Sequence, residues 1–141
     1  MKTGFLSLAL SILLSLCSPS SADDLALFQG TWEMKGSNKG KPVQVIKTIK
    51  DNHETVEVYT GGVLTQKHEV EFELKTYGPA KVFVWKKGVI TEGPRKGQSL
   101  PAGRFIYKIE PKKLTGVHGM LEGDQTPILR EVYMRVADTT A

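Results

Sequence analysis

The chain has 141 residues, a formal net charge of +4 at pH 7 and a single cysteine, Cys17. This length suits one domain with a hydrophobic core of its own. Because Cys17 lies in an amino-terminal segment that we expect to be removed, the remaining domain has no disulfide and no thiolate metal site.

The first 22 residues have the pattern of a secretory signal peptide. Lys2 provides a positive start, residues 5–16 form an apolar run broken only by small residues, and small residues lead to an expected cleavage after Ala22. A membrane anchor is one alternative, but the apolar run is shorter than the roughly 20 residues that a spanning helix needs. Lipid attachment at Cys17 is another, which Leu16 disfavours because the residue before a lipidated cysteine is normally small.

We therefore expect an exported protein whose folded domain occupies residues 23–141 and has no integral membrane span. A domain without cysteine favours a bacterial envelope protein, periplasmic or extracellular, because small secreted animal domains are often rich in disulfides.

The domain begins with a pattern typical of one helical turn followed by a β-strand. Asp23 and Asp24 can cap the turn, because carboxylates accept hydrogen bonds from the free N–H groups at a helix start. Gly30 ends the turn and Trp32 opens the first strand. In a barrel, three apolar residues of the turn would cover one open end: Leu25, Leu27 and Phe28.

The rest of the domain is a series of short strand patterns separated by turn residues. Apolar Val56 and Val58 alternate with polar Thr55 and Glu57, as in a strand with one buried face. Strand patterns recur about every 10 to 14 residues, which favours an all-β fold, an antiparallel up-and-down β-barrel of about eight strands. The expected strands after the first cover residues 43–50, 53–60, 64–74, 81–87, 104–110, 114–120 and 128–136.

The glycine pair at residues 61–62 marks a hairpin whose register can be predicted. A strict two-residue loop would place apolar residues of one strand opposite charged residues of the next, whereas a shift by one residue corrects every pair. We therefore predict a three-residue loop, residues 61–63, which a Thr60–Val63 pair would contradict. The expected cross-strand pairs are Val58 with Gln66 and Val56 with His68.

An eight-stranded barrel is either filled by side chains or hollow enough for one small ligand. His68 falls on the inward face beside Gln66, where the two side chains could hydrogen-bond a ligand's polar head, or His68 could ligate a metal or a haem. The alternative is that a neighbouring residue satisfies this histidine, or that it lies near the barrel mouth. Candidate cavity residues are Val56, Val58, Leu64, Gln66, His68, Val70, Phe105, Tyr107 and His118.

The domain holds too few matched ligands to predict a metal site or a cofactor. Its histidines are His53, His68 and His118, without cysteines at ligand spacing. The sequence also has no Gly-x-Ser-x-Gly motif and no phosphate-binding loop. We therefore expect a non-enzymatic monomer with no metal, no cofactor and no nucleic-acid partner.

Gly30-Thr31-Trp32 after a helical turn resembles the Gly-x-Trp start motif of the lipocalin family. More specifically, the chain is similar to short secreted lipocalin-like domains of planctomycete-type bacteria. The resemblance implies a barrel in which Trp32 packs across one end beneath a basic residue of the last strand, Arg135 or alternatively Arg130. Gly30, Trp32 and Arg135 would then form a structural motif. The other matching pieces are Gly40-Lys41-Pro42, residues 92–97, Ile106-Tyr107 and Arg135.

We expect an exported barrel that binds a small apolar or amphipathic ligand. An alternative is a protein- or envelope-interaction module, such as an inhibitor, that uses the basic stretch at residues 81–113. A third is a hydrolase or isomerase, which needs His68 and His118 within hydrogen-bonding reach of each other. The interaction module requires six basic residues to converge on one surface: Lys86, Lys87, Arg95, Lys96, Lys112 and Lys113.

Overall fold

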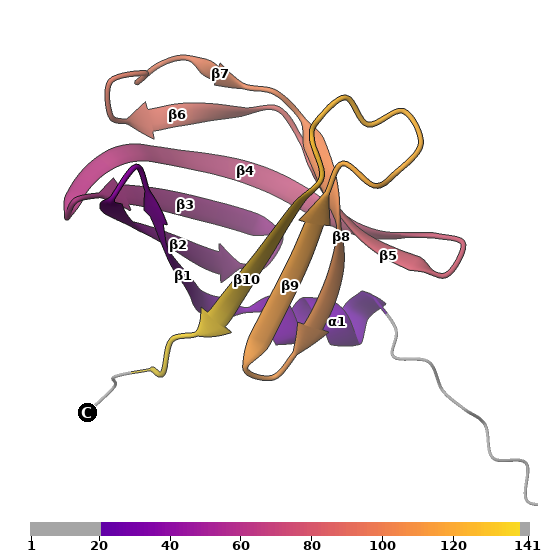
Figure 1. Ribbon diagram of the computed structural model, residues 1–141. Coiled ribbons are helices and arrows are strands. Elements are labelled where there is room, and N and C mark those ends of the chain that lie inside the picture. The colour runs from indigo at the N-terminus through magenta and orange to yellow at the C-terminus, as the bar shows by residue number, and fades with distance from the viewer. Residues whose placement is uncertain (1–20, 139–141) are drawn as a thin grey trace, which may run out of the picture.

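This computed structural model describes residues 21–138, which contain one helix and ten strands joined by turns and loops (Figure 1). The predicted signal peptide, residues 1–22, lies outside this range except for its last two residues. No helix within the range has the length and apolar character needed to cross a membrane. The elements are α1 (Ser21–Phe28), β1 (Gly30–Asn38), β2 (Lys41–Lys50), β3 (His53–Thr60), β4 (Val63–Tyr77), β5 (Ala80–Trp85), β6 (Gly88–Glu92), β7 (Ser99–Leu100), β8 (Gly103–Glu110), β9 (Lys113–His118) and β10 (Leu129–Arg135).

Eight of the strands close into an antiparallel β-barrel. The order around it is β3-β2-β1-β10-β9-β8-β5-β4, and β4 pairs with β3 to complete the circle. The predicted all-β barrel of about eight strands is therefore confirmed. Strands β6 and β7 form a hairpin outside this circle (Figure 1).

The longest strand, β4, has two partners along one edge. Residues 72–77 pair with β5, whereas residues 67–69 pair with β6. The β6–β7 hairpin thus extends the barrel wall beyond the end of β5. Gly93 permits the close packing, because its φ is +103° and a Cβ there would lie 2.2 Å from the carbonyl oxygen of Thr65.

The hairpin between β3 and β4 has the predicted register but not the predicted loop. Thr60 pairs with Val63, so the three-residue loop is wrong: the turn has two glycines, with φ angles of 58° and 80°. The register shifts further along, because Thr65 is an extra residue on β4 and its hydroxyl donates to the carbonyl oxygen of Val58 (3.0 Å). This bulge, rather than a longer loop, produces the predicted pairs of Val58 with Gln66 and Val56 with His68.

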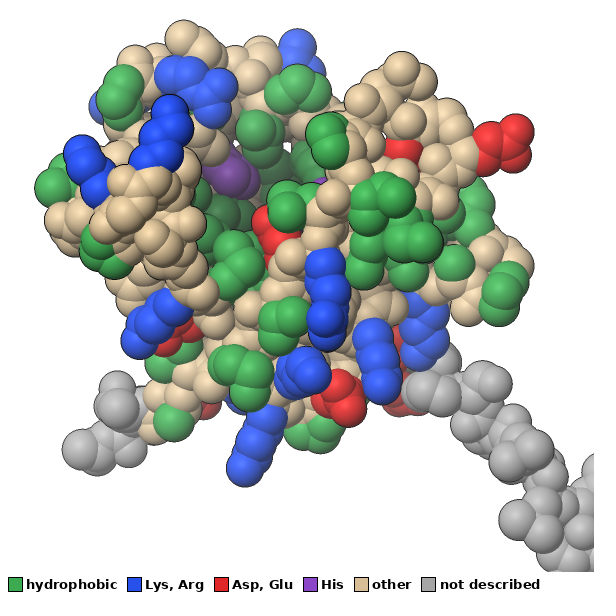
Figure 2. Space-filling view, in the orientation of Figure 1, with side chains coloured by type: hydrophobic (Ala, Val, Ile, Leu, Met, Phe, Trp, Pro, Cys, Tyr) green, Lys and Arg blue, Asp and Glu red, His purple; other side chains and the backbone are tan. Residues whose placement is uncertain are grey.

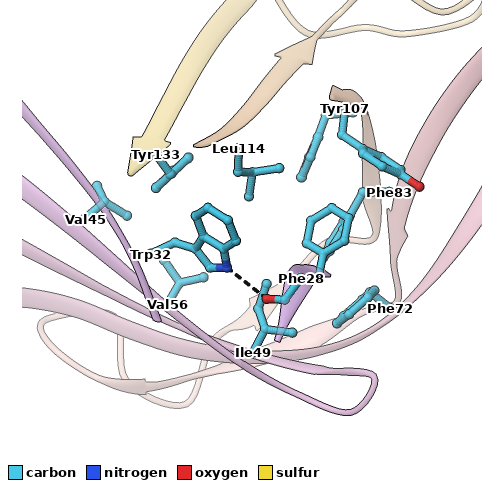
Figure 3. Close-up of a cluster of buried hydrophobic side chains, with 11 residues drawn as sticks. Phe28, Trp32, Val45, Ile49, Val56, Phe72, Phe83, Tyr107, Leu114 and Tyr133 are labelled. Atoms are coloured by element: carbon cyan, nitrogen blue, oxygen red, sulfur yellow. Dashed lines mark hydrogen bonds between the residues drawn. The ribbon is translucent and has the colours of Figure 1, made fainter. Parts of the chain in front are cut away.

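Inward-facing aromatic side chains fill the barrel end nearest α1 (Figure 3). Phe83 stacks on Phe72 and on Phe105, with ring centroids 4.3 and 4.7 Å apart. Phe28 of α1 meets Tyr107 edge-on at 4.9 Å. Each such ring pair adds about 0.5–1.5 kcal/mol beyond the area that it buries. The buried cluster consists of Phe28, Trp32, Val45, Ile49, Val56, Phe72, Phe83, Phe105, Tyr107, Leu114 and Tyr133.

Helix α1 covers this filled end and is longer than the single predicted turn, with eight residues. Asp24, which we expected to cap the helix, turns its carboxylate towards the barrel. Its Oδ2 accepts hydrogen bonds from the Tyr107 hydroxyl and the Lys81 ammonium, both at 2.8 Å. These bonds join α1 to β8 and β5.

The seam between β1 and β10 is short. β1 pairs with β2 along its whole length but with β10 at only two positions, Trp32–Arg135 and Glu33–Met134. From this point the two strands diverge away from α1 (Figure 1). The barrel is therefore tied firmly at the filled end and more loosely at the other.

Candidate functional site

The Gly-x-Trp motif lies at the filled end of the barrel. The Arg135 guanidinium is 4.2 Å from the Trp32 ring, and it also donates hydrogen bonds to two carbonyl oxygens at the end of α1. The Trp32 Nε1–H donates to the carbonyl oxygen of Phe28 (2.8 Å). Gly30 leaves room for the guanidinium, because a Cβ there would lie 2.8 Å from Arg135 Nη1. Of the two basic residues considered, Arg135 is the one that packs on Trp32.

The opposite end of the barrel is hollow. A cavity of about 260 Å³ opens there, and Figure 2 shows a depression with mainly hydrophobic walls and a histidine inside it. Small-molecule sites in proteins usually measure about 300–1,000 Å³, so this one suits a compact molecule. The lining residues are Val45, Lys47, Glu54, Val56, Val58, His68, Val70, Trp85, Leu100, Phe105, His118, Glu131 and Tyr133.

A buried ion pair forms the floor of the cavity. Lys47 Nζ lies 2.9 Å from Glu54 Oε1, and both side chains are less than a tenth exposed. The same ammonium lies 5.2 and 4.7 Å from the ring centroids of Phe105 and Tyr133, which belong to the aromatic core. Burial, the largest single influence, would lower the pKa of Lys47, but Glu54, Tyr133 and Glu131 together outweigh it and raise the pKa above its usual value. Lys47 therefore stays charged.

Glu54 has a charge partner but no directed hydrogen bond at Oε1. This oxygen is buried and accepts no hydrogen bond of good geometry from the residues described, although the Lys47 ammonium is close. Buried polar atoms are normally hydrogen-bonded. The Glu54 carboxylate thus lines the cavity floor with its Oε1 covered beside the Lys47 ammonium.

A second carboxylate, Glu131, lies in the cavity wall. Its Oε2 accepts a hydrogen bond from the Tyr133 hydroxyl (3.1 Å) and lies 3.2 Å from His118 Nε2. Burial would raise the pKa of Glu131, but the hydrogen bond from His118 and the positive charge of Lys47 hold the pKa below its usual value. Glu131 is thus an anion at neutral pH.

His68 lies between the cavity and its rim. Its Nδ1 is 2.9 Å from the Gln66 amide nitrogen, and Arg95 donates to the Gln66 amide oxygen (2.6 Å). Arg95 itself belongs to the tip of the β6–β7 hairpin and does not line the cavity. Burial lowers the pKa of His68, which favours the neutral imidazole.

Six of the nine residues predicted for the cavity line it: Val56, Val58, His68, Val70, Phe105 and His118. The other three lie elsewhere. Leu64 precedes the bulge in β4 and pairs with Tyr59 on the outer face of the barrel. Gln66 lies at the rim, and Tyr107 lies deeper, where it binds Asp24.

Three charged residues of the cavity were not predicted from the sequence: Lys47 and Glu54, which are buried, and Glu131, which is partly buried. The alternation of side chains contained a signal for Lys47, because it lies between Val45 and Ile49, which point inward along β2. A charged residue at such a position is usually assigned to solvent, since unpaired burial of a charge is costly. Only the approach of Glu54 makes the inward position acceptable.

Together these features define an eight-stranded antiparallel barrel with one filled end and one hollow end. Within residues 21–138, no three side chains of His, Cys, Asp or Glu gather as a metal ion would require. Comparison of the chain with protein-family models, with curated proteins and with solved structures finds no match.

Proposed function

We propose that this protein is an exported, non-enzymatic barrel of the lipocalin type that binds one small apolar or amphipathic molecule at its open end. The cavity of about 260 Å³ carries this proposal. Its walls are mainly aliphatic and aromatic, and a few polar groups converge on its floor, as is typical of small-molecule sites. The Arg135–Trp32 contact at the other end supports the lipocalin part of the proposal, because the resemblance predicts it.

The arrangement of the basic residues gives the interaction module less support. Lys112 lies at the filled end, because its carbonyl oxygen accepts a hydrogen bond from the backbone N–H of Arg135 (3.0 Å). Arg95 lies at the open end, where it binds Gln66. The basic stretch is thus divided between the two ends of the barrel (Figure 1).

The histidines give the enzyme alternative little support. His68 bonds to Gln66, and His118 bonds to Glu131. Each imidazole therefore has its own partner, and the two do not form the pair that a general acid–base mechanism on this barrel would need.

Two measurements test the binding proposal. Native mass spectrometry of the protein purified from its own host should show a co-purified small molecule. Separately, the neutral dye N-phenyl-1-naphthylamine should gain fluorescence on binding, and Val58→Phe should reduce this gain because the larger side chain fills the cavity. Val63→Phe is the matched control, since Val63 is 66% exposed and does not line the cavity. Equal fluorescence from both variants and the parent would contradict the proposal.

A further inference from the structure

The charges inside the cavity are unbalanced. Two carboxylates, Glu54 and Glu131, line it together with one ammonium, Lys47. His68 and His118 line the cavity too, and each adds a positive charge only when protonated. The Arg95 guanidinium lies on the rim, bound to Gln66. With both imidazoles neutral, a ligand that enters meets an excess of negative charge.

Lys47 already interacts through its ammonium group with a carboxylate and two aromatic rings. Its ammonium is 2.9 Å from the Glu54 carboxylate, and the faces of Phe105 and Tyr133 lie within 5.2 and 4.7 Å of Nζ. An ammonium already attracted to a carboxylate and to two ring faces is less available to a second anion. A ligand carboxylate would have to displace Glu54 and would also lie near Glu131.

The negative groups, by contrast, retain acceptor capacity. Glu54 is 4% exposed, and its Oε1 lacks a directed hydrogen bond from the described residues. A carboxylate has about four lone-pair sites, and Glu131 uses Oε2 for both His118 and Tyr133. A donor group on a ligand would gain the attraction of both carboxylates, which line the cavity.

The walls above these groups suit an aromatic or aliphatic body. Trp85 and Phe105 present ring surfaces, with centroids 6.0 Å apart, and three valines of β3 and β4 complete the apolar side. Resting on the binding function proposed above, we propose that the ligand is a compact amphipathic amine, whose ammonium group lies against Glu54 and Glu131 and whose apolar body lies against Trp85 and Phe105.

Three probes of nearly equal shape test this proposal: 3-phenylpropylamine, 3-phenylpropan-1-ol and 3-phenylpropanoate. Their dissociation constants are measured by isothermal titration calorimetry at pH 7 and low ionic strength. We expect the amine to bind on the order of tenfold or more tighter than the carboxylate, with the alcohol between them, because like charges repel in a partly buried site.

Glu131→Gln is the main variant, because glutamine keeps the shape and can still accept a hydrogen bond from His118. It should weaken amine binding, strengthen carboxylate binding and leave alcohol binding almost unchanged. Glu57→Gln is the matched control for net charge, since Glu57 bonds to Tyr59 and pairs with Lys67 outside the cavity. Glu54→Gln should have the same direction of effect as Glu131→Gln, with circular dichroism to check that the fold survives the loss of the Lys47 partner.

The outcomes separate the two proposals. If the alcohol binds but the amine binds no tighter than the carboxylate, the amine proposal is overturned and the binding function stands. An amine preference that survives in Glu131→Gln and Glu54→Gln would also overturn it. If neither the three probes nor the neutral dye binds, both proposals fail.

Discussion

Side chains alternate between inward and outward positions at both ends of the barrel, but the inward residues differ between the two ends. At the filled end, inward positions hold Trp32, Phe72, Phe83 and Tyr107, which all belong to one buried cluster. At the hollow end, inward positions hold valines, histidines and charged residues around a cavity. One end therefore contributes packing to stability, whereas the other leaves space and places polar groups around it.

The residues that close the barrel are therefore different from most of those that line its cavity. Arg135 joins β10, α1 and Trp32 at the filled end, so the hollow end does not have to supply these contacts. Substitutions at the filled end should then change stability with little direct effect on binding, and substitutions at the hollow end should do the reverse.

The largest effect is expected for Trp32→Ala. The Trp32 side chain is fully buried, so its removal should cost about 3–5 kcal/mol of unfolding free energy and the cation–π contact with Arg135 besides. Urea unfolding followed by circular dichroism measures the loss. Trp85→Ala is the matched variant at the other end: it should cost less stability and should weaken probe binding. An unchanged melting temperature in Trp32→Ala would show that this end does not hold the barrel closed.

Lys47→Met tests the buried ion pair at the cavity floor, where the hollow end borders the aromatic core. It leaves Glu54 buried without its ammonium partner, so we expect a loss of about 3–5 kcal/mol. Adding Glu54→Leu should recover most of this loss, because a buried ion pair can be replaced by apolar groups at little cost. For comparison, Lys67→Met breaks a more exposed pair with Glu57 on the outer surface and should cost about 1 kcal/mol or less. Equal losses for Lys47→Met and Lys67→Met would contradict the buried ion pair.

Gly93→Ala tests the wall that the β6–β7 hairpin adds at the hollow end. A Cβ at this position would collide with Thr65, and the backbone has a positive φ, so we expect a cost of about 1–3 kcal/mol. Gly97→Ala is the control, because its φ is also positive, at +87°, while the space around it is open. Hydrogen exchange should show faster opening of β6 in Gly93→Ala than in Gly97→Ala, with β1 and β2 unaffected.

The smallest effect is a pH dependence at His68. Burial lowers its pKa in the folded protein below the value of about 6.5 that an unfolded chain has. Between these two pKa values the unfolded state binds more protons, so stability is lost as pH falls through about 6.5 towards the folded pKa. His68→Gln should flatten this part of the stability curve, measured by urea unfolding from about pH 5 to 8. The exposed His53→Gln is the control, and the same slope in parent and His68→Gln would be evidence against a buried neutral His68.

The fold could be predicted because alternation is a local property of the chain. Val56 and Val58 reveal the inward face of β3, and Gly30-Thr31-Trp32 indicates how the barrel begins. The register of β3 and β4 was also predictable, because a one-residue shift would expose every apolar side chain. The bulge at Thr65 was not, since a longer turn and a bulge produce the same pairs beyond it.

The charged floor of the cavity was harder to predict, because a charged residue is buried there only when an oppositely charged residue from another strand lies beside it. Lys47 and Glu54 belong to adjacent strands, and each alone suggests a solvated position. Glu131 comes from the last strand and reaches the same cavity through the closure of the sheet. The alternation of the sequence indicates that these residues point inward. Only the closed barrel shows that the three charged side chains line the same cavity.

The short seam between β1 and β10 also has a consequence for how the chain matures. Arg135 reaches the carbonyl oxygens of Leu27 and Gln29 across 108 and 106 residues of chain. The ribosome makes β1 long before it makes β10, so the barrel remains an open sheet until the last strand arrives. During that interval the edges of β1 and β9 lack their final partner, and a chaperone or a stray strand can pair with either edge. Completion of the circle thus has to wait for the last strand, β10.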